Sequence, residues 1–499
     1  MRWKLRSESI KSTFIGIDLG TTFSAVAVVE MTPHEQWQVR NLMLSDSKGA
    51  QKGFLLSTRV DFSNLTYPQV GIQTFSSLVI AGFQFKPKIG LGGAISLTRE
   101  AEVSPDKAAV VVLRHLYTQI IDQLSPRWEE SVVTLAIPAP GDEAQQVKRW
   151  ESFHRIAEEA GFQQIRLLDE PIAALLDVAL TTSGGGGIGL SDQTVLVVDY
   201  GGGTCDVAIV RTGQRRLFTG GRGKILAVAS KECGGVYIDK ALANWLRKKH
   251  GDKINDKGII EKARSIKEAL YQRNSARKRE LLSKIGLTER KFMDISRPVV
   301  SQLKEVMGQA IDQASRTEGE ITIDQVVLTG GGSKHPLVKE VVYEFFDQYQ
   351  AKQPRVIWSR HPQLNVSRGA AWYGLYHSIY QLPFYEEAEQ DVFLKFPDGH
   401  KKRLIRKGES IPFKKPKRFA FRFESTSEGL LELPLYCIEG KEEYECAVAF
   451  LDFKERISLG RILILELSMQ FRDRIFIKGI VPAQNIEADT VVYLQRRRK

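Results

Sequence analysis

The sequence predicts an α/β protein in which a large region of alternating strands and helices is followed by a small antiparallel β-domain. Apolar, β-rich runs alternate with helical stretches up to about residue 380, and two strand–turn–strand segments in this region repeat one another. After residue 390 short alternating runs replace that pattern. The 499 residues are also too many for one hydrophobic core, so more than one domain is expected.

The α/β region is expected to cover residues 14–380. Its buried strands are predicted from the apolar runs Phe14–Ile17, Val132–Ile137, Val195–Val198 and Val326–Leu328. Helical spacing is found at Pro105–Leu124, Ala144–Ala160, Ile238–His250 and in the charged segment Asp256–Ser283. The run Ser183–Gly187 is expected to be a loop inside this region, because strand-like sequence resumes directly after it.

An internal repeat divides the α/β region into two halves. Asp18–Val29 reads DLGTTFSAVAVV and Asp199–Val210 reads DYGGGTCDVAIV, and the two align without a gap. Each copy places an aspartate at the end of one strand, then a turn of small residues, then a second apolar strand. A duplicated pair of lobes, each contributing one β-hairpin to a shared cleft, explains the repeat.

The two repeated turns have the composition of a phosphate site. Small residues let successive backbone N–H groups approach one anion, and the hydroxyls of Thr21, Thr22 and Thr204 can donate to the same phosphates. Asp18 and Asp199 lie at the strand ends and would face a polyphosphate. Two carboxylates in that position are explained by a bound Mg²⁺.

A third glycine turn supports this interpretation. Gly330–Gly332 follows the apolar strand Val326–Leu328. Two ordinary hairpins with capping aspartates are the alternative for the repeated turns alone. Two matched copies together with a third turn favour nucleotide binding.

Composition restricts the class of protein. Hydrophobic residues make up 42% and charged residues 26%, and no apolar run reaches the roughly 18–20 residues of a membrane helix. Residues 1–13 form a basic N-terminal extension without the apolar stretch of a secretory signal, so a cytoplasmic protein is expected. Cys205, Cys233, Cys437 and Cys446 form no C-x-x-C pair, which argues against a structural zinc site. Reduced, packed thiols are expected, although Cys437 and Cys446 can face each other across a hairpin.

The net charge of +12 indicates an acidic partner, and nucleotide phosphate, nucleic acid and a membrane surface are the alternatives. Much of the charge lies in a segment that we call the basic cluster, residues 401–418, and in the terminal Arg496–Lys499. The cluster contains Lys401, Lys402, Arg403, Arg406, Lys407, Lys414, Lys415, Lys417 and Arg418. RNA-recognition and helix-turn-helix signatures are absent from the sequence, so a solvated basic face is expected rather than a nucleic-acid site.

The order of the motifs resembles the five nucleotide-site motifs of the actin, hexokinase and heat-shock chaperone superfamily. The segments are FIGIDLGTTFSAVAV, LLDEPIAALL, VVDYGGGTCDVAIV, VVLTGGGSKHP and RGAAWYGL. The segment FQFKPKIG and the forms GTTFS and DEP-x-AAL are similar to the DnaK-type heat-shock chaperones in particular. The resemblance implies a duplicated actin-like, ribonuclease H-like, two-lobed ATPase domain over residues 14–380 that binds ATP or ADP with Mg²⁺.

The resemblance implies a role for each residue that matches a motif. Lys86 matches the catalytic lysine that holds the γ-phosphate and the attacking water, and Glu170 matches the carboxylate that orients that water. Asp199 matches the carboxylate that polarises that water or organises Mg²⁺, Asp18 matches the magnesium-side aspartate, and Thr204 matches the threonine beside the γ-phosphate. Phosphoryl transfer needs such positioning and charge neutralisation more than covalent chemistry.

The remaining nucleotide contacts fall on the turns and on one helix. The matching turn positions are Gly20, Thr21, Thr22, Gly201, Gly202, Gly203, Gly330, Gly331 and Gly332. On the adenosine side Arg264 and Lys267 match nucleoside contacts, and Lys334 stands where the family usually has an arginine. Tyr271 replaces a small hydroxyl residue, and Pro138 matches the proline that relays the nucleotide state between the lobes.

Residues 391–499 resemble the family's β-sandwich peptide-binding domain. The alternating runs are Val392–Phe396, Arg418–Phe423, Leu430–Ile438, Tyr444–Leu451, Arg461–Leu467 and Arg474–Ile480. LIRKGESIPFKK matches a turn motif of that domain, and FESTSEGLLELPLYCIEGKE aligns with the strands that line its groove. By that alignment an extended peptide would meet Leu394, Phe396, Phe423, Leu433 and Leu435. The alternative is that these side chains form the core of a small sandwich.

Two departures from the family concern the linker and the lid. Residues 381–390, interpreted as the interdomain linker, have only scattered apolar side chains, and no helical lid is expected because the chain ends at Lys499. The expected protein is a lidless, ATP-hydrolysing, chaperone-like protein that binds unfolded or extended apolar peptides. A J-domain-type cochaperone and a nucleotide-exchange factor are further partners that the resemblance implies, and neither a membrane nor nucleic acid is expected as a partner. A small-molecule kinase, a nucleotide-gated scaffold with little turnover, and an anionic-polymer or membrane-surface binder that uses the basic cluster remain as alternatives.

Overall fold

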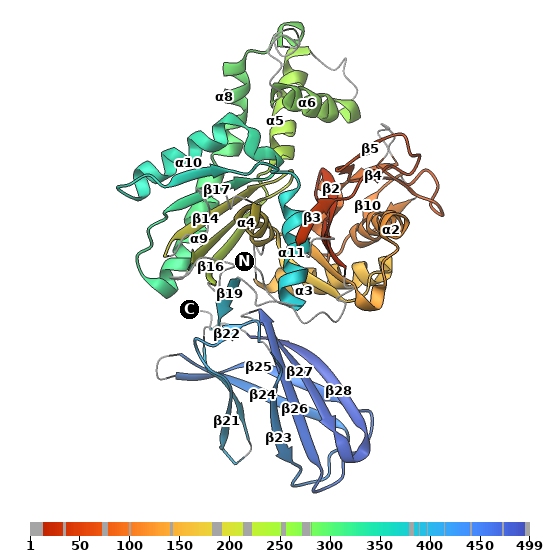
Figure 1. Ribbon diagram of the computed structural model, residues 1–499, viewed down its shortest axis with the longest axis vertical. Helices are drawn as coiled ribbons and strands as arrows, with labels where there is room; N and C mark the ends of the chain where they lie inside the picture. The colour runs from red at the N-terminus through yellow and green to blue at the C-terminus, as the bar shows by residue number, and fades with distance from the viewer. Residues whose placement is uncertain are drawn as a thin grey trace. The chain divides into compact units, whose positions relative to one another are not determined.

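The computed structural model describes residues 13–32, 36–71, 78–98, 101–139, 143–181, 192–212, 222–250, 256–271, 280, 282–378, 384–388, 390–396, 398–413, 415–439, 442–471 and 474–494. The chain forms two compact units (Figure 1). Unit 1 contains residues 1–222 and 226–383, and unit 2 contains residues 223–225 and 384–499. Unit 1 mixes helices and sheets, which confirms the predicted α/β fold class. No helix among these residues is long and apolar enough to cross a membrane.

The first half of unit 1 is built on a sheet with the strand order β13–β12–β1–β2–β3, in which β6 also pairs with β2. The central strand β1 (Phe14–Asp18) runs parallel to β12 (Val132–Ile137) and antiparallel to β2 (Phe23–Met31). The other strands are β3 (Trp37–Asn41), β6 (Leu56–Ser57) and β13 (Ile165–Asp169). β12 is buried at every position, as expected for a continuous apolar run.

The second half of unit 1 repeats this strand order as β18–β17–β14–β15–β16. Here β14 (Thr194–Tyr200) runs parallel to β17 (Gln325–Thr329) and antiparallel to β15 (Cys205–Thr212). The other strands are β16 (Gly223–Lys231) and β18 (Arg355–Trp358). The two repeated sequence segments therefore occupy equivalent positions, on β1–β2 and on β14–β15, in two sheets of the same strand order.

Most predicted helices are present. α2 (Pro105–Leu124) has the predicted bounds, and Ser104 begins it by accepting a hydrogen bond from the amide of Lys107. The other long helices are α3 (Glu143–Ala160), α5 (Gly235–His250), α6 (Asp256–Tyr271), α8 (Glu289–Val300), α9 (Leu303–Glu318) and α10 (Pro336–Tyr349). Residues 272–279 and 281 of the predicted helix Asp256–Ser283, and the predicted loop Ser183–Gly187, lie outside the described residues.

Short elements complete unit 1. They are β4 (Leu44–Ser45), β5 (Lys52–Gly53), β7 (Arg59–Asp61), β8 (Gln69–Val70), β9 (Val79–Ala81), β10 (Ile95–Ser96), β11 (Glu102–Val103), the helical turn α1 (Gly82–Phe85), and the 3-10 turns η1 (Lys86–Lys88), η2 (Trp128–Glu130) and η4 (Gly331–Lys334). η1 follows α1 directly, and the two turns carry most of the segment FQFKPKIG, residues 83–90.

Two helices lie between the sheets of unit 1, α4 (Glu170–Thr181) and α11 (Asn365–Ser378) (Figure 1). α11 packs on β1, β2 and β12, whereas α4 packs on β14 and β15 and against α11. Asp177 of α4 is fully buried and receives hydrogen bonds from Arg368 Nε at 3.0 Å and Asn365 Nδ2 at 2.5 Å. Burial raises the pKa of Asp177, and Arg368 opposes that shift. This crossing fixes the position of α4 and therefore of its first residue, Glu170.

Unit 2 contains two four-stranded antiparallel sheets. Their strand orders are β21–β20–β24–β25 and β23–β26–β27–β28. The strands are β20 (Val392–Lys395), β21 (Lys401–Ile405), β23 (Lys417–Arg422), β24 (Leu430–Glu439), β25 (Glu442–Asp452), β26 (Ile462–Phe471), β27 (Arg474–Val481) and β28 (Ile486–Tyr493). One hydrophobic cluster contains buried side chains of both sheets, for example Leu435 and Leu465.

Several elements of unit 2 were not predicted. β21 and β28 carry so many charged or polar residues that their alternation is weak in the sequence. β19 (Phe384–Glu387) lies within the segment interpreted as a linker, and it pairs with β22 (Ser410–Ile411). Residues 381–383 and 389 of that segment lie outside the described residues.

Candidate active site

Acidic side chains from both halves of unit 1 gather around one lysine. Asp18 ends β1, Asp199 lies near the end of β14, Asp206 lies on β15, and Glu170 begins α4. Lys86 begins η1 and is only 3% exposed. Its Nζ lies 2.5 Å from Oε1 of Glu170, 84 residues away in the sequence. Four of these five residues were predicted, and the structure brings them together.

Burial raises the proton affinity of this acidic group. Burial, followed by the charge of Glu170, raises the pKa of Asp18 to about 7 and that of Asp206 to about 6. Burial and the neighbouring carboxylates, Glu170 first, raise the pKa of Asp199 well above its usual range. Burial disfavours the charge of Lys86, but Glu170 and Asp18 outweigh this effect and raise the lysine pKa. The acidic group thus places four carboxyl side chains around a single lysine.

The excess of negative charge fits a divalent cation. No set of three or more Asp, Glu, His or Cys side chains in the described ranges forms a closed metal cage. Mg²⁺ beside a nucleotide typically keeps several waters and uses one or two carboxylates plus phosphate oxygens. Asp18 and Asp199, the predicted metal-side residues, with Asp206 opposite Asp199 in the β14–β15 register, suit Mg²⁺ held in that way.

The glycine turns predicted from separate segments meet at this group. A Cβ atom on Gly202 would lie 2.4 Å from Oγ1 of Thr22 and 2.7 Å from Oγ1 of Thr21, so the turns of the two halves touch and only glycine fits. Gly330 has a φ of +82°, and a Cβ atom there would lie 2.3 Å from Oδ1 of Asp199. The third turn therefore also reaches the acidic group.

The start of α5 holds the second turn in place. The amides of Gly234, Gly235 and Val236 donate to the carbonyl oxygens of Gly203, Gly201 and Gly202 at 2.9, 3.0 and 2.7 Å. Gly201 N also donates to the carbonyl of Thr204 at 2.9 Å and closes the turn. These contacts fix a compact turn of the kind that can present its amides to an anion.

Asp206 is a site residue that the motif search missed. Thr204 Oγ1 donates to its Oδ2 at 2.6 Å, and the amide of Ala139 donates to its Oδ1 at 3.1 Å. It therefore links the second turn to Ala139, which directly follows Pro138 in the other half of unit 1. The sequence did contain a signal, because an acidic residue interrupts an otherwise apolar strand. Arg149 of α3, also missed, interacts electrostatically with Asp206 and Glu170, and burial lowers its pKa.

Two of the three predicted adenosine contacts, Arg264 and Lys267, form internal ion pairs. Lys267 Nζ lies 2.7 Å from Oδ1 of Asp239 and donates to the carbonyl of Gly235 at 2.8 Å. Arg264 Nε lies 3.3 Å from Oδ2 of the same aspartate. Lys334 is exposed, and its Nζ donates to Oε1 of Gln363 at 2.8 Å. Arg264 and Lys267 thus help to fix the start of α5, beside the second turn.

Tyr271 and His335 lie against each other next to these ion pairs, with ring centroids 5.7 Å apart. His335 Nδ1 accepts a hydrogen bond from the amide of Leu337 at 3.1 Å. Burial, then Lys267, lowers the His335 pKa to about 4, so the neutral ring carries its proton on Nε2. Within the part of the chain that the structure describes, His335 Nε2 and the Tyr271 hydroxyl have no hydrogen-bond partner. Buried polar atoms are normally paired, so these two are exceptions in this region.

The predicted peptide contacts of unit 2 divide into two groups. Leu394, Leu433 and Leu435 are 3%, 7% and 1% exposed and belong to the hydrophobic core. Phe396 and Phe423 are partly exposed and pack against that core. A peptide can therefore reach the aromatic residues directly, but it can reach the leucines only if the domain opens.

Sequence comparisons place the chain among known proteins. The family model described as "Hsp70 protein" matches residues 92–379. Chaperone protein DnaK of Thermus thermophilus is 27% identical over 393 residues, which cover 72% of this chain and 60% of that protein. The chaperone protein HscA homolog of Bordetella petrii is 25% identical over 466 residues, covering 86% and 68%. The HscA homolog of Acidithiobacillus ferrooxidans is 31% identical over 265 residues, covering 50% and 39%.

The relatives and the family model cover different shares of the proteins compared. The chain spans about 60% of the length of the DnaK relative, so this match does not show that the chain has the activity of the whole relative. The family model, in contrast, covers more than half of the 499 residues and includes Glu170, Asp199 and the turn Gly330–Gly332. The chain therefore belongs to the Hsp70 family.

Proposed function

We propose that the protein is an ATP-hydrolysing, chaperone-like protein whose second unit binds extended peptide segments. The observation that carries this proposal is the buried Lys86–Glu170 pair beside Asp18, Asp199 and Asp206, where the three glycine turns meet. A buried lysine with a short contact to one carboxylate is a costly arrangement for stability alone. It is useful where a γ-phosphate and an attacking water must be held in line.

Each side chain has a role in this proposal. The amides of the turns and the hydroxyls of Thr21, Thr22 and Thr204 hold the phosphates. Lys86 Nζ holds the γ-phosphate and the water, and Glu170 accepts a hydrogen bond from that water and orients it. Asp18 and Asp199 would hold Mg²⁺, which would neutralise charge at the phosphates. Asp206 holds the Thr204 hydroxyl in position through its 2.6 Å hydrogen bond.

The architecture of both units supports the proposal. We interpret the two sheets of unit 1 as duplicated lobes of an actin-like ATPase domain over residues 14–380, because their strand orders and directions correspond. We interpret residues 391–499 as a β-sandwich peptide-binding domain, because two antiparallel sheets share one core. Residues 381–390 would then connect the two domains.

Peptide binding is proposed for the partly exposed aromatic residues Phe396 and Phe423, with Leu394, Leu433 and Leu435 reached only when the domain opens. The named relatives are chaperone proteins, which supports a chaperone role. A cytoplasmic location and a J-domain-type cochaperone or exchange factor as partner are further parts of the proposal. A nucleotide-gated scaffold with little turnover is the second candidate. It is favoured by the internal ion pairs of Arg264 and Lys267 with Asp239.

A steady-state ATPase assay of the full chain, with and without an unfolded apolar peptide, tests the proposal. We expect Mg²⁺-dependent hydrolysis that the peptide changes, and loss of turnover in Asp199→Asn. Asp192→Asn, an exposed aspartate near the start of the same strand, is the matched control. Tight nucleotide binding without turnover would support the scaffold instead, and absence of nucleotide binding would overturn both candidates.

A further inference from the structure

Unit 2 has two neighbouring strands with open edges. Among the described residues, β21 pairs only with β20, and β23 pairs only with β26. Lys417 of β23 connects the two strands, because its Nζ donates to the carbonyl of Leu404 at 3.1 Å and to Glu409 Oε2 at 2.6 Å. An open edge offers backbone N–H and C=O groups with which an extended polypeptide can pair.

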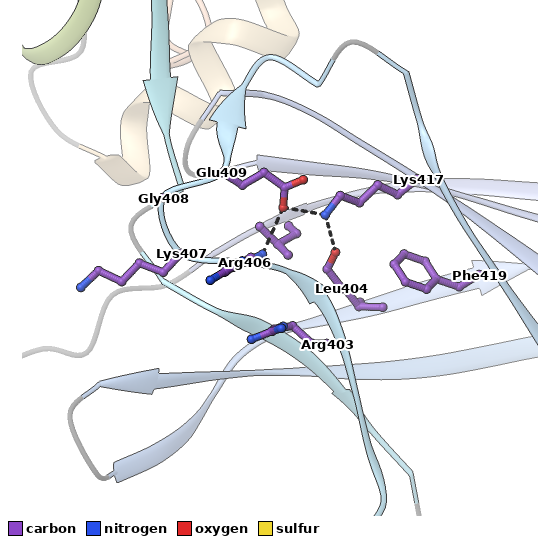
Figure 2. Close-up of a pocket in the computed structure, with 9 residues that line it drawn as sticks. Arg403, Leu404, Arg406, Lys407, Gly408, Glu409, Lys417 and Phe419 are labelled. Carbon is purple, nitrogen blue, oxygen red and sulfur yellow. Dashed lines mark hydrogen bonds and ion pairs between the residues drawn. The ribbon is translucent and has the colours of Figure 1, made fainter.

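The surface around these edges is strongly basic. Residues 401–423 contain ten Lys and Arg side chains and one acidic residue, Glu409. A pocket of about 630 Å³ lies here, lined by residues 403–409 with Lys417 and Phe419 (Figure 2). Figure 2 shows Arg403, Arg406 and Lys407 extending toward the same side of the pocket, away from Phe419. The pocket therefore has one cationic side and one aromatic side.

The nearby carboxylates are already engaged. Glu409 Oε2 accepts from Lys417 Nζ and, at 3.2 Å, from the amide of Arg406. Asp391 Oδ1 accepts from the amide of Lys407 at 3.0 Å and lies 3.9 Å from the guanidinium of Arg403. In the described part of unit 2, the side-chain charges of Arg406 and Lys407 have no counterion. Other cations of the domain do, as in the pair of Lys478 with Glu487 at 2.7 Å.

The exposed side of β23 continues the positive charge. Arg418, Ala420 and Arg422 are exposed, whereas Phe419 and Phe421 are partly buried between them. Arg418 pairs with Glu466 of β26 at 2.5 Å, and Arg422 forms no ion pair within the described residues. A strand added at this edge would place side chains beside these arginines, where opposite charges stabilise cross-strand pairs.

A polypeptide fits this surface better than a nucleic acid. Bases bind single-strand sites by stacking on free aromatic faces. Two aromatic rings of this surface already have a lysine over one face. Lys402 Nζ lies 5.9 Å from the ring centroid of Phe419, and Lys417 Nζ lies 5.0 Å from that of Phe413. Phe421 packs against Phe396, with ring centroids 5.5 Å apart. Carboxylates and phosphates both match guanidinium groups in geometry and charge, but only a polypeptide can also pair its backbone with the open edge of β23.

We propose that the ligand of unit 2 is an acidic extended segment, in which apolar residues are flanked by Asp or Glu, bound along the open edge of β23. The flanking carboxylates pair with Arg406, Lys407 and Arg422. The inference rests on the proposed peptide binding by unit 2 and adds to it the charge of the preferred ligand.

The test uses the full chain and two fluorescent peptides with the same apolar centre, one flanked by Asp and Glu and the other by Lys and Arg. Fluorescence anisotropy gives the Kd of each at two salt concentrations. We expect the acid-flanked peptide to bind about tenfold or more tightly, with a preference that declines as salt is added. The double variant Arg406→Gln/Lys407→Gln should lose this preference, whereas Lys478→Gln on β27 should keep it. Thermal melts check that each variant is folded.

The outcomes separate the two proposals. Equal binding of both peptides would leave peptide binding intact and overturn the charge preference. If neither peptide binds, peptide binding by unit 2 is wrong and this inference falls with it. Displacement of the acid-flanked peptide by single-stranded RNA at lower concentration than by unlabelled peptide would assign the surface to nucleic acid and overturn the inference.

Discussion

Replacing Lys86 with methionine tests the proposed chemistry and its energetic cost together. Methionine keeps most of the side-chain volume and removes the charge. Lys86 is 3% exposed, and its Nζ lies 2.5 Å from Oε1 of Glu170. Loss of one partner of a buried pair typically costs about 3–5 kcal/mol of unfolding free energy. We expect about 3 kcal/mol here at neutral pH, at the low end of that range.

The same change should abolish hydrolysis. Without Lys86 nothing on η1 holds the γ-phosphate, and the loss of such a preorganised contact typically lowers the rate by a factor of about 100–1,000. The loss of stability caused by this change should become smaller as the pH falls, because protonation of Asp18 and Asp206 then reduces the negative charge that the lysine offsets. Asp18, with a pKa of about 7, takes up its proton early in that fall.

Two measurements check this prediction, urea unfolding of the nucleotide-free protein and single-turnover hydrolysis with Mg²⁺. The matched control is Lys88→Met, an exposed lysine on the same turn, which should change neither. Adding Glu170→Gln to Lys86→Met should recover part of the lost stability, because the unpaired carboxylate is removed, but it should recover no hydrolysis. If Lys86→Met unfolds at the urea concentration of the control, or turns over ATP near the parent rate, the assigned role of Lys86 is wrong.

Three further predictions concern pH, thiols and nucleotide release. Folding raises the pKa of Asp18 from 3.8 to about 7, so its contribution to stability is full below about pH 4 and is lost as the pH rises through about 7. The melting temperature of the nucleotide-free protein should therefore fall between these pH values. Mg²⁺ with ADP should make the melting temperature depend less on pH. Cys437 and Cys446 are buried, and their Sγ atoms lie 2.7 Å apart. Oxidised glutathione should therefore convert them slowly into a disulfide. Peptide mapping should detect this disulfide, and the variant Cys437→Ser should not form it. Arg59 of β7 forms an ion pair with Glu261 of α6, which joins the two halves of unit 1. Arg59→Ala should therefore speed the release of a fluorescent ADP. An unchanged release rate would show that this ion pair does not retain the nucleotide.

The sequence determined the parts of the site that depend on local pattern. The second repeated turn needs a small residue where it packs against the first, because a Cβ atom on Gly202 would lie 2.4 Å from the Thr22 hydroxyl. Asp18 and Asp199 were predictable because both end an apolar strand within the same repeated motif. α2 was predicted to the residue because Ser104 and Pro105 mark its start.

The tertiary structure decided which side chains face one another. Asp206 joins the site because the β14–β15 register places it opposite Asp199 and the fold brings Ala139 to its other oxygen. Arg264 and Lys267 were assigned to a nucleoside, yet both pair with Asp239, a contact between two helices. The alternation of apolar and polar residues is compatible with Leu433 in a groove or in the core. Leu433 lies in the core because side chains of both sheets of unit 2 form one hydrophobic cluster with it. Burial and charge pairing depend on partners distant in sequence, and a local pattern carries no information about which partners the fold supplies.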